Sequence, residues 1–387
     1  MTLSARMHSR CLTLSLAGGM MLLSPRLARA EGSISYKYED YRESGDRIAV
    51  KTQSALIEQD IDPQTHVKIQ GVIDAIAGAT PNGQPAPAGS DQVVLSNMDD
   101  RRKAWSADFS HQFQMVNIAA GVANSRESDY TSTGWSLNTL TTFNEKDTTL
   151  LAGVAGTDDE VKVFYQTAWE KKRTHDVILG VTQLLDPHTS VAINLSWDQA
   201  TGYLSDPYKL VQKSTEVAPG IFLPFTFGEN RPDQRTKWIV FTSLNRDLPN
   251  VHAALEATYR FTHDSFGTNA STVTINWLQH LGQKFILQPE LRFYDQSAAD
   301  FYHYNLDTTA IMPTGGAPHA GPYYSSDYRL SALRTYLYGL KAVWTPAPRW
   351  QIDAAIEQYD MRGKDGVTAK SAYPRALVLT GGVKFSW

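Results

Sequence analysis

Charged and aromatic side chains that could bind a solute gather in three short stretches of the sequence. Residues 202–209 read GYLSDPYK, residues 231–235 read RPDQR, and residues 292–302 read RFYDQSAADFY. Stretches this rich in aromatic residues suit ordered loops rather than disordered ones. Such loops either hold themselves together by hydrogen bonds, or fold inward to form a constriction or a ligand site. The candidate residues are Tyr203, Asp206, Tyr208, Lys209, Arg231, Arg235, Arg292, Tyr294 and Asp295.

The sequence offers little for catalysis. Its ten histidines occur without the HExxH or CxxC spacing of a metal site. His263, Asp264 and Ser265 have the residue types of a catalytic triad, but adjacent residues of a strand point to opposite faces. No glycine-rich phosphate loop follows a strand. We therefore expect no enzymatic activity, no metal and no cofactor.

The first thirty residues have the features of an export signal. Arginines precede an apolar run that is too short to span a bilayer, and Ala28-Arg29-Ala30 forms a cleavage pattern. We expect residues 1–30 to be a cleaved signal peptide and residues 31–387 to form one domain. The leader holds the only cysteine and four of the 36 basic residues, with no acid, so the mature chain has a formal charge of about −8. This charge argues against a nucleic-acid partner.

Runs of about ten residues with alternating polarity recur along the rest of the chain. Residues 190–199, for example, place Val191, Ile193 and Leu195 on one face, and Asn194 and Asp198 on the other. This alternation is typical of a transmembrane β-strand. Sixteen such runs begin near Ile34, Ile48, Thr65, Arg101, Met115, Ser132, Thr148, His175, Ser190, Thr236, Val251, Ser271, Phe285, Ala332, Trp350 and Ala376.

The length of the link that follows a run depends on whether the run is even- or odd-numbered along the chain. Links after even-numbered runs are short and rich in turn residues, whereas most of the others are longer, residues 200–235 and 297–331 above all. We predict an all-β fold: a transmembrane antiparallel β-barrel of about 16 strands, between 14 and 18, with short periplasmic turns and long extracellular loops. It would lie in the bacterial outer membrane, surrounded by outer-membrane lipid. A soluble β-sandwich would not separate its loops in this way, and a β-solenoid would need a repeat that the sequence lacks.

The polar faces of the runs carry both signs of charge. Inside a barrel, these side chains would either pair across neighbouring strands or form a polarised constriction that selects small hydrophilic solutes. The predicted lumen-facing charges are Lys51, Lys68, Asp74, Asp108, Asp198, Glu256, Arg260, Glu290, Arg292, Lys341, Asp353, Glu357 and Lys384.

The last run, LTGGVKFSW, is expected to close the barrel against residues 33–41, because an unpaired strand edge in lipid costs several kcal/mol per group. Leu379, Gly381 and Val383 would face lipid, with Phe385 and Trp387 in the periplasmic aromatic girdle. An aromatic end on an alternating strand also resembles the signal that the β-barrel assembly machinery reads. We expect that deleting residues 385–387 abolishes membrane assembly.

Several motifs together resemble a bacterial family. ISYKYEDYRESGDRIAV, DAIAGATP, GYLSDPYKLV, RPDQR and LRFYDQSAADFY, in this order, are similar to an uncharacterised outer-membrane β-barrel family, a domain of unknown function, over residues 31–387. The resemblance implies no catalytic residues. It implies a setting instead, since members are often encoded near thioredoxin-like proteins, small lipoproteins and a flavin transferase.

Three functions fit these observations. The first is a porin-like channel or conduit for small solutes, linked through its setting to extracytoplasmic redox or flavin-dependent electron transfer. The second is a non-conducting scaffold that docks periplasmic or extracellular redox proteins or lipoproteins. The third, an outer-membrane enzyme, has the least support because no catalytic constellation is found.

Overall fold

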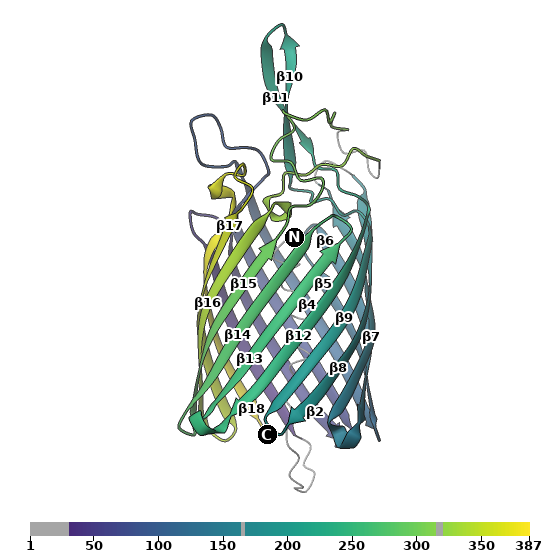
Figure 1. Cartoon of the computed structure of the whole chain (residues 1–387), viewed down its shortest axis with the longest axis vertical. Coiled ribbons are helices and arrows are strands. Elements are labelled where there is room, and N and C mark those ends of the chain that lie inside the picture. The colour runs from purple at the N-terminus through teal and green to yellow at the C-terminus, as the bar shows by residue number, and fades with distance from the viewer. Residues whose placement is uncertain (1–30, 164–166, 315–319) are drawn as a thin grey trace.

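Sixteen strands form a closed antiparallel barrel (Figure 1). The computed structural model describes residues 31–163, 167–314 and 320–387, so the expected signal peptide lies outside the described residues. The barrel strands are β1 (Gly32–Glu43), β2 (Ala49–Asp62), β3 (Thr65–Pro81), β4 (Leu95–Phe113), β5 (Val116–Arg126), β6 (Tyr130–Phe143), β7 (Thr148–Lys162), β8 (Trp169–Asp186), β9 (Thr189–Gly202), β12 (Gln234–Leu248), β13 (Ala253–Asp264), β14 (Asn269–Leu281), β15 (Phe285–Gln296), β16 (Leu333–Ala347), β17 (Trp350–Gly363) and β18 (Arg375–Ser386).

Two further strands, β10 (Leu210–Ala218) and β11 (Ile221–Gly228), form a separate hairpin between β9 and β12. Four single 3₁₀ turns complete the regular structure of the described residues: η1 (Asn144–Lys146), η2 (Pro249–Val251), η3 (Tyr328–Leu330) and η4 (Lys370–Ala372). Among the described residues, no helix has the length and apolar character needed to cross a membrane.

The first and last strands close the barrel as predicted. β1 pairs with β18 along its length, so that Ser33 lies opposite Ser386 and Tyr36 opposite Val383. The ring of Phe385 lies 4.9 Å from that of Trp350 and 6.2 Å from that of Trp387. This pairing leaves no free edge in the barrel wall, which is the condition for a sheet to exist in lipid.

The wall alternates between an apolar outer face and a polar inner face. Outward side chains such as Ile69, Leu195 and Ile356 are about half exposed, as expected for groups that face lipid. Inward side chains form ion pairs across the interior surface, including Arg102 with Asp74 at 2.5 Å and Lys384 with Glu58 at 3.6 Å. Because only alternate residues of the strands are apolar, the mean hydropathy stays at −0.33.

One predicted lumen residue, Lys51, faces outward instead. It shares the exposed face of β2 with Ile57 and lies opposite Asp40 of β1. The prediction was wrong because Val50 and Ile48, which are apolar, point inward and pack together near the end of the barrel that carries the long loops. Apolar residues on the inner face reverse the apparent phase of the alternation.

All the long connections lie at one end of the barrel, here called the loop end, and the connections at the other end, the turn end, are all short. At the turn end, β2 and β3 are joined by two residues, and so are β8 and β9. At the loop end, several strands run further than the sequence predicts: β8, expected to begin near His175, begins at Trp169. The reason is cross-strand charge pairing beyond the apolar band, as between Arg173 and Asp158 at 2.6 Å.

Candidate functional site: a cap over the barrel mouth

Three long loops meet over the loop end of the barrel. We call them together the cap; its described residues are 82–94, 203–233, 297–314 and 320–332. Around the wall, the loops are separated by six strands (β4 to β9), four strands (β12 to β15) and six strands (β16 to β18 and β1 to β3). Loops that leave the rim so far apart can touch one another only across the mouth.

Hydrogen bonds join each of these loops to the others. The backbone N–H of Leu210 donates to the carbonyl of Asn82 at 2.7 Å, and Ser326 Oγ donates to the carbonyl of Leu210 at 2.7 Å. Asn230 and Tyr324 exchange two backbone bonds of 2.8 and 3.0 Å. The backbone N–H of Ala86 donates to the Tyr304 hydroxyl at 3.0 Å. The cap is therefore one connected structure.

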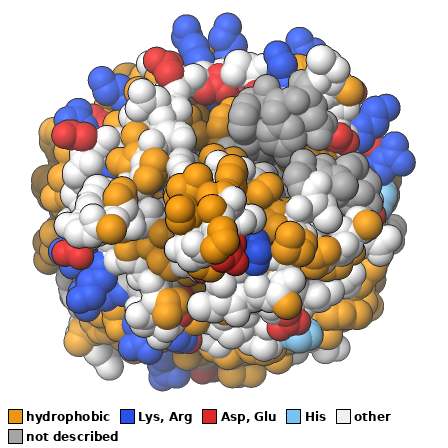
Figure 2. All heavy atoms as spheres, turned by 90° about the horizontal axis from the view of Figure 1, so that it is seen from above, with side chains coloured by type: hydrophobic (Ala, Val, Ile, Leu, Met, Phe, Trp, Pro, Cys, Tyr) orange, Lys and Arg blue, Asp and Glu red, His pale blue; other side chains and the backbone are white. Residues whose placement is uncertain are grey.

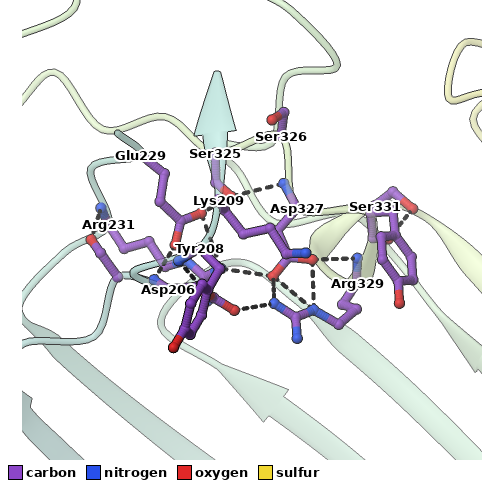
Figure 3. A network of polar contacts seen from close by, with 12 residues as sticks. Asp206, Tyr208, Lys209, Glu229, Arg231, Ser325, Ser326, Asp327, Arg329 and Ser331 are labelled. Atoms are coloured by element: carbon purple, nitrogen blue, oxygen red, sulfur yellow. Dashed lines mark hydrogen bonds and ion pairs between the residues drawn. The ribbon is translucent and has the colours of Figure 1, made fainter. Parts of the chain in front are cut away.

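A network of buried charges lies at the centre of these contacts (Figure 3). Arg231 binds Glu229 through Nε at 2.7 Å and Asp327 through Nη2 at 2.8 Å. Arg329 donates from Nε to Asp327 at 2.6 Å and from Nη2 to Asp206 at 2.6 Å. The Glu229 and Asp327 side chains are almost fully buried, at 0% and 1% exposed. Two arginines thus connect three carboxylates from two loops.

Lys209 fixes this network to the barrel rim. It is buried, donates from Nζ to the carbonyl of Pro81 at the end of β3, and lies 5.8 Å from the centre of the Tyr328 ring. Tyr328 is itself buried, and its ring meets that of Tyr373, in the β17–β18 loop, edge to face at 5.7 Å. A fourth loop thereby supports the cap.

The three buried carboxyl groups have different pKa values because their electrostatic surroundings differ. Burial favours the protonated form of each, but Arg329 and Lys209 outweigh this effect and lower the pKa of Asp206 to about 2. Against the same burial, Arg329 and Arg231 hold the pKa of Asp327 well below its usual range. At Glu229 burial prevails over Arg231 and raises the pKa to about 7. Asp206 and Asp327 are therefore ionised at neutral pH, whereas Glu229 is close to its midpoint.

Apolar clusters hold the loops around this network. Val211, Leu306 and Tyr324, one from β10 and two from the β15–β16 loop, are fully buried together. Phe266, Phe301 and Ala299 form a second cluster with Leu330. Burial of large side chains of this kind stabilises by about 1.5–3 kcal/mol each. This packing supports the cap in addition to its ion pairs.

The predicted loop residues mostly belong to this cap or its rim. Asp206, Lys209 and Arg231 are part of the network. Tyr208 donates its hydroxyl to Asp129 of the β5–β6 loop, and Tyr203 packs with Tyr130 and Val161. Arg235, at the start of β12, binds Asp264 at 2.9 Å and lies 4.5 Å from the Phe266 ring.

Apart from Asp295, the remaining candidate residues line the inner wall. Asp198 lies opposite Asp176 and Lys237 on the neighbouring strands. Glu256 accepts from Asn276 Nδ2 at 3.2 Å, and Arg260 lies 5.6 Å from the Phe241 ring. Tyr294 donates to Gln296 at 2.5 Å, and it shares the inward face of β15 with Glu290 and Arg292. Both signs of charge therefore line the wall below the cap.

Asp295 departs from the prediction. It lies on the outward face of β15, together with Leu291 and Phe293, where it pairs with Arg334 at 3.5 Å and with Lys364. The prediction grouped Asp295 with the stretch 292–302, which was expected to form an ordered loop. The strand continues through Gln296, so its alternation places Asp295 outside.

The sequence analysis missed Glu229, Asp327 and Arg329, which complete the network. One signal was present: Ser326-Asp327-Tyr328-Arg329 repeats the residue types of Ser205-Asp206-Pro207-Tyr208-Lys209 in the other long loop. In both stretches an Asp and a cation flank a Tyr that lies in the cap or at its rim. Two matching stretches in different loops indicate a common structure, although they do not show that the stretches meet.

The hairpin of β10 and β11 was also missed. It projects away from the barrel beyond the other labelled elements (Figure 1). Pro219-Gly220, with Gly220 at φ +76°, turns the chain between two short strands, a recognisable turn signal. The far part of the hairpin exposes Val217, Ile221, Phe222, Leu223 and Phe225, each at 45% or more. Seen from the loop end, hydrophobic side chains gather near the centre of the face (Figure 2).

One group of carboxylates has a spacing that a cation could use. Oxygens of Asp100, Glu127 and Asp129 lie within 4.8 Å of one another at the rim. Asp129 already accepts from Tyr208, and Asp100 accepts from the backbone N–H of Ser128 at 3.2 Å. Internal hydrogen bonds therefore account for part of this cluster without a metal.

A closed antiparallel barrel with an apolar outer band and a polar inner wall is the architecture of outer-membrane β-barrel proteins. The chain belongs to the family described as protein of unknown function DUF3570, whose model matches residues 9–385. No curated protein matches its sequence.

Several solved structures are similar to this chain, each with a TM-score below 0.5. The siderophore receptor PirA from Pseudomonas aeruginosa is 12% identical, with 93% of this chain and 62% of that chain covered and a TM-score of 0.44. A bacterial polysaccharide outer membrane secretin is 7% identical, with 92% of this chain and 98% of that chain covered and a TM-score of 0.49. OmpTdeltaL8 of Vibrio cholerae is a loop-deletion mutant of an outer membrane protein. It is 7% identical, with 93% of this chain and 99% of that chain covered and a TM-score of 0.45. The chain spans about three fifths of the length of the PirA receptor.

Proposed function

We propose that this protein is a gated conduit for small hydrophilic solutes, located in the bacterial outer membrane with its cap on the extracellular side. One observation carries the proposal. A barrel interior lined by both signs of charge is covered by a cap that is held shut by a buried ion-pair network. Charged lumen walls select hydrophilic solutes, and a loop structure that can open would control their entry. The proposal includes no enzymatic step.

Conductance in planar bilayers tests this function. We expect rare, small steps from the wild-type protein. The double variant Arg231→Gln/Arg329→Gln should show more frequent or larger steps, because its cap loses the cations that connect the two loops. Arg362→Gln is the matched control, since Arg362 is exposed on the outer wall and pairs there with Asp360. If neither protein conducts salt or passes small sugars, although both keep the gel mobility of a folded barrel, the conduit is rejected.

A non-conducting scaffold is the second candidate, and the hairpin favours it. Five large apolar side chains exposed on the far part of the hairpin have no role in a simple channel. The resemblance to a family encoded near redox proteins adds a partner class, flavin- or haem-bearing proteins or lipoproteins. Absorption spectroscopy of the protein purified from its native membrane tests this. A flavin or haem band that disappears when the outer half of the hairpin is removed would support the scaffold, and its absence from the wild type would contradict it.

A further inference from the structure

A polar shelf interrupts the outer wall of β4 to β9 just beyond the apolar band. Its first row consists of residues in direct register: Trp105, Asn124, Thr133, Asp158, Arg173 and Thr201. The second row, nearer the loop end, is Lys103, Arg126, Thr131, Glu160 and Lys171. By alternation, these residues share the outward face with the lipid-facing Val122, Trp135, Val154 and Val177.

The charges on this shelf are not balanced. Lys103 lies directly opposite Arg126, and Arg101 is the next outward residue of β4. No ion pair joins any of these three to an acid within the described parts of the chain. Like charges directly opposite each other in a sheet are destabilising, so an external anion would relieve the repulsion. The exposed outward residues of β4 to β8 around the shelf include six cations, Arg101, Lys103, Arg126, Lys162, Lys171 and Arg173, and three acids, Asp99, Asp158 and Glu160.

Next to these cations lies a cavity of about 510 Å³. Its lining includes the three threonines Thr131, Thr133 and Thr201, together with Asp158 and Lys171. Its volume falls in the range of small-molecule sites, about 300–1,000 Å³. Hydroxyl groups and carboxylates suit the hydroxyls of a sugar, which both donate and accept hydrogen bonds. The shelf therefore offers a site for a sugar beside a site for phosphate.

The position of the shelf identifies the occupant as a lipid. Trp105 and Trp135 mark the interface of the membrane, where tryptophan is enriched. The shelf begins beside them and faces outward, at the depth of lipid head groups. A plain anionic phospholipid would match the cations. It would leave the Glu160 carboxylate and the hydroxyls of Thr131 and Thr201 without a partner, whereas Asp158 already pairs with Arg173. From this arrangement we infer that the outer wall of β4 to β9 binds the phosphorylated sugar head group of a glycolipid. This inference rests on the outer-membrane location proposed above.

Binding of purified lipid A to the protein in zwitterionic bicelles tests the site. We expect lipid A to raise the melting temperature of the wild type, because a ligand that binds only the folded state stabilises it. The variant Lys103→Gln/Arg126→Gln should bind at least tenfold more weakly. Without lipid A it should be no less stable than the wild type, since its repulsion is removed. Thr133→Val should also bind more weakly, whereas Arg362→Gln, in an ion pair on the other side of the barrel, should bind normally.

The comparison lipids separate the possible sources of phosphate. Phosphatidylglycerol bicelles and inorganic phosphate should shift the melting temperature much less than lipid A. Equal shifts from phosphatidylglycerol, or equal lipid A affinity in the wild type and the double variant, would overturn the inference. Membrane fractionation tests the location separately: a protein absent from the outer membrane that still binds lipid A would contradict the location and leave the site intact.

Discussion

Each buried charge of the cap depends on its partners, and Asp327 is the carboxylate that both arginines share. It accepts from Arg231 at 2.8 Å and from Arg329 at 2.6 Å. Asp327→Asn should loosen the cap by about 3–5 kcal/mol, because it leaves two buried guanidinium groups without their shared carboxylate. Limited proteolysis of the folded barrel measures this as faster cleavage within residues 203–233.

Asp158→Asn provides the matched control. Its pair with Arg173 is about two thirds exposed, so we expect a change within about 1 kcal/mol and an unchanged cleavage rate. Equal cleavage of the Asp327 variant and the wild type would show that the network does not hold the cap.

Glu229 should make the cap sensitive to pH. Burial raises its pKa to about 7, above the ordinary value of 4.5, so the folded cap binds this proton more tightly than the open chain. The stability it contributes is complete below about pH 4.5 and is lost as the pH rises to about 7. Arg231, Ser325, Asp327 and Asp206 surround it, and both aspartates, with lowered pKa values, stay ionised throughout this window.

Hydrogen exchange of the cap at pH 5 and pH 8, corrected for the intrinsic rate, measures this effect. We expect less protection at pH 8 in the wild type and a smaller change in Glu229→Gln. His303, whose pKa burial lowers, acts in the opposite direction and is present in both proteins. The same pH dependence in both would contradict a role for Glu229.

At the scale of elements, the hairpin has two parts with different roles. Val211, near its base, is fully buried in the cap, whereas the far part is exposed. Replacing residues 214–224 with Asn-Gly, a tight hairpin turn, should leave the melting temperature and the rest of the cap unchanged. Val211→Asp should destabilise the cap, because it buries a charge without a partner. Thermal unfolding and proteolysis distinguish the two variants. If the shortened hairpin exposed the cap to protease, its outer half would have a structural role.

At the scale of the whole molecule, the lipid face and the inner face of one strand should respond differently to the same charge. Leu379 is 46% exposed on the outer face of β18, while the adjacent Thr380 faces inward, 3.5 Å from Glu39. Leu379→Lys should destabilise the barrel by up to about 2–4 kcal/mol, and Thr380→Lys should have little effect. The temperature at which gel mobility changes on heating measures this. Equal sensitivity of both variants would contradict the assigned faces.

The sequence by itself determined the barrel. Sixteen strand starts, the separation of short turns from long loops and the closing pair of β1 and β18 all follow from a local rule, because every second side chain of a membrane strand must be apolar. The rule failed for Lys51 and Asp295, near the loop end, where strands continue beyond the lipid and inward residues such as Val50 pack beneath the cap.

Only the tertiary structure determines which residues of the long loops meet over the barrel mouth. Asp206 and Arg329 are 123 residues apart, and Arg231 and Asp327 are 96 apart, so no spacing in the sequence could pair them. Their meeting depends on closure of the barrel, which places loops from distant strands around one mouth. The alignment of Lys103 with Arg126 likewise depends on strand register. Alternation is a property of each strand alone, whereas the cap and the shelf arise from how strands and loops are brought together.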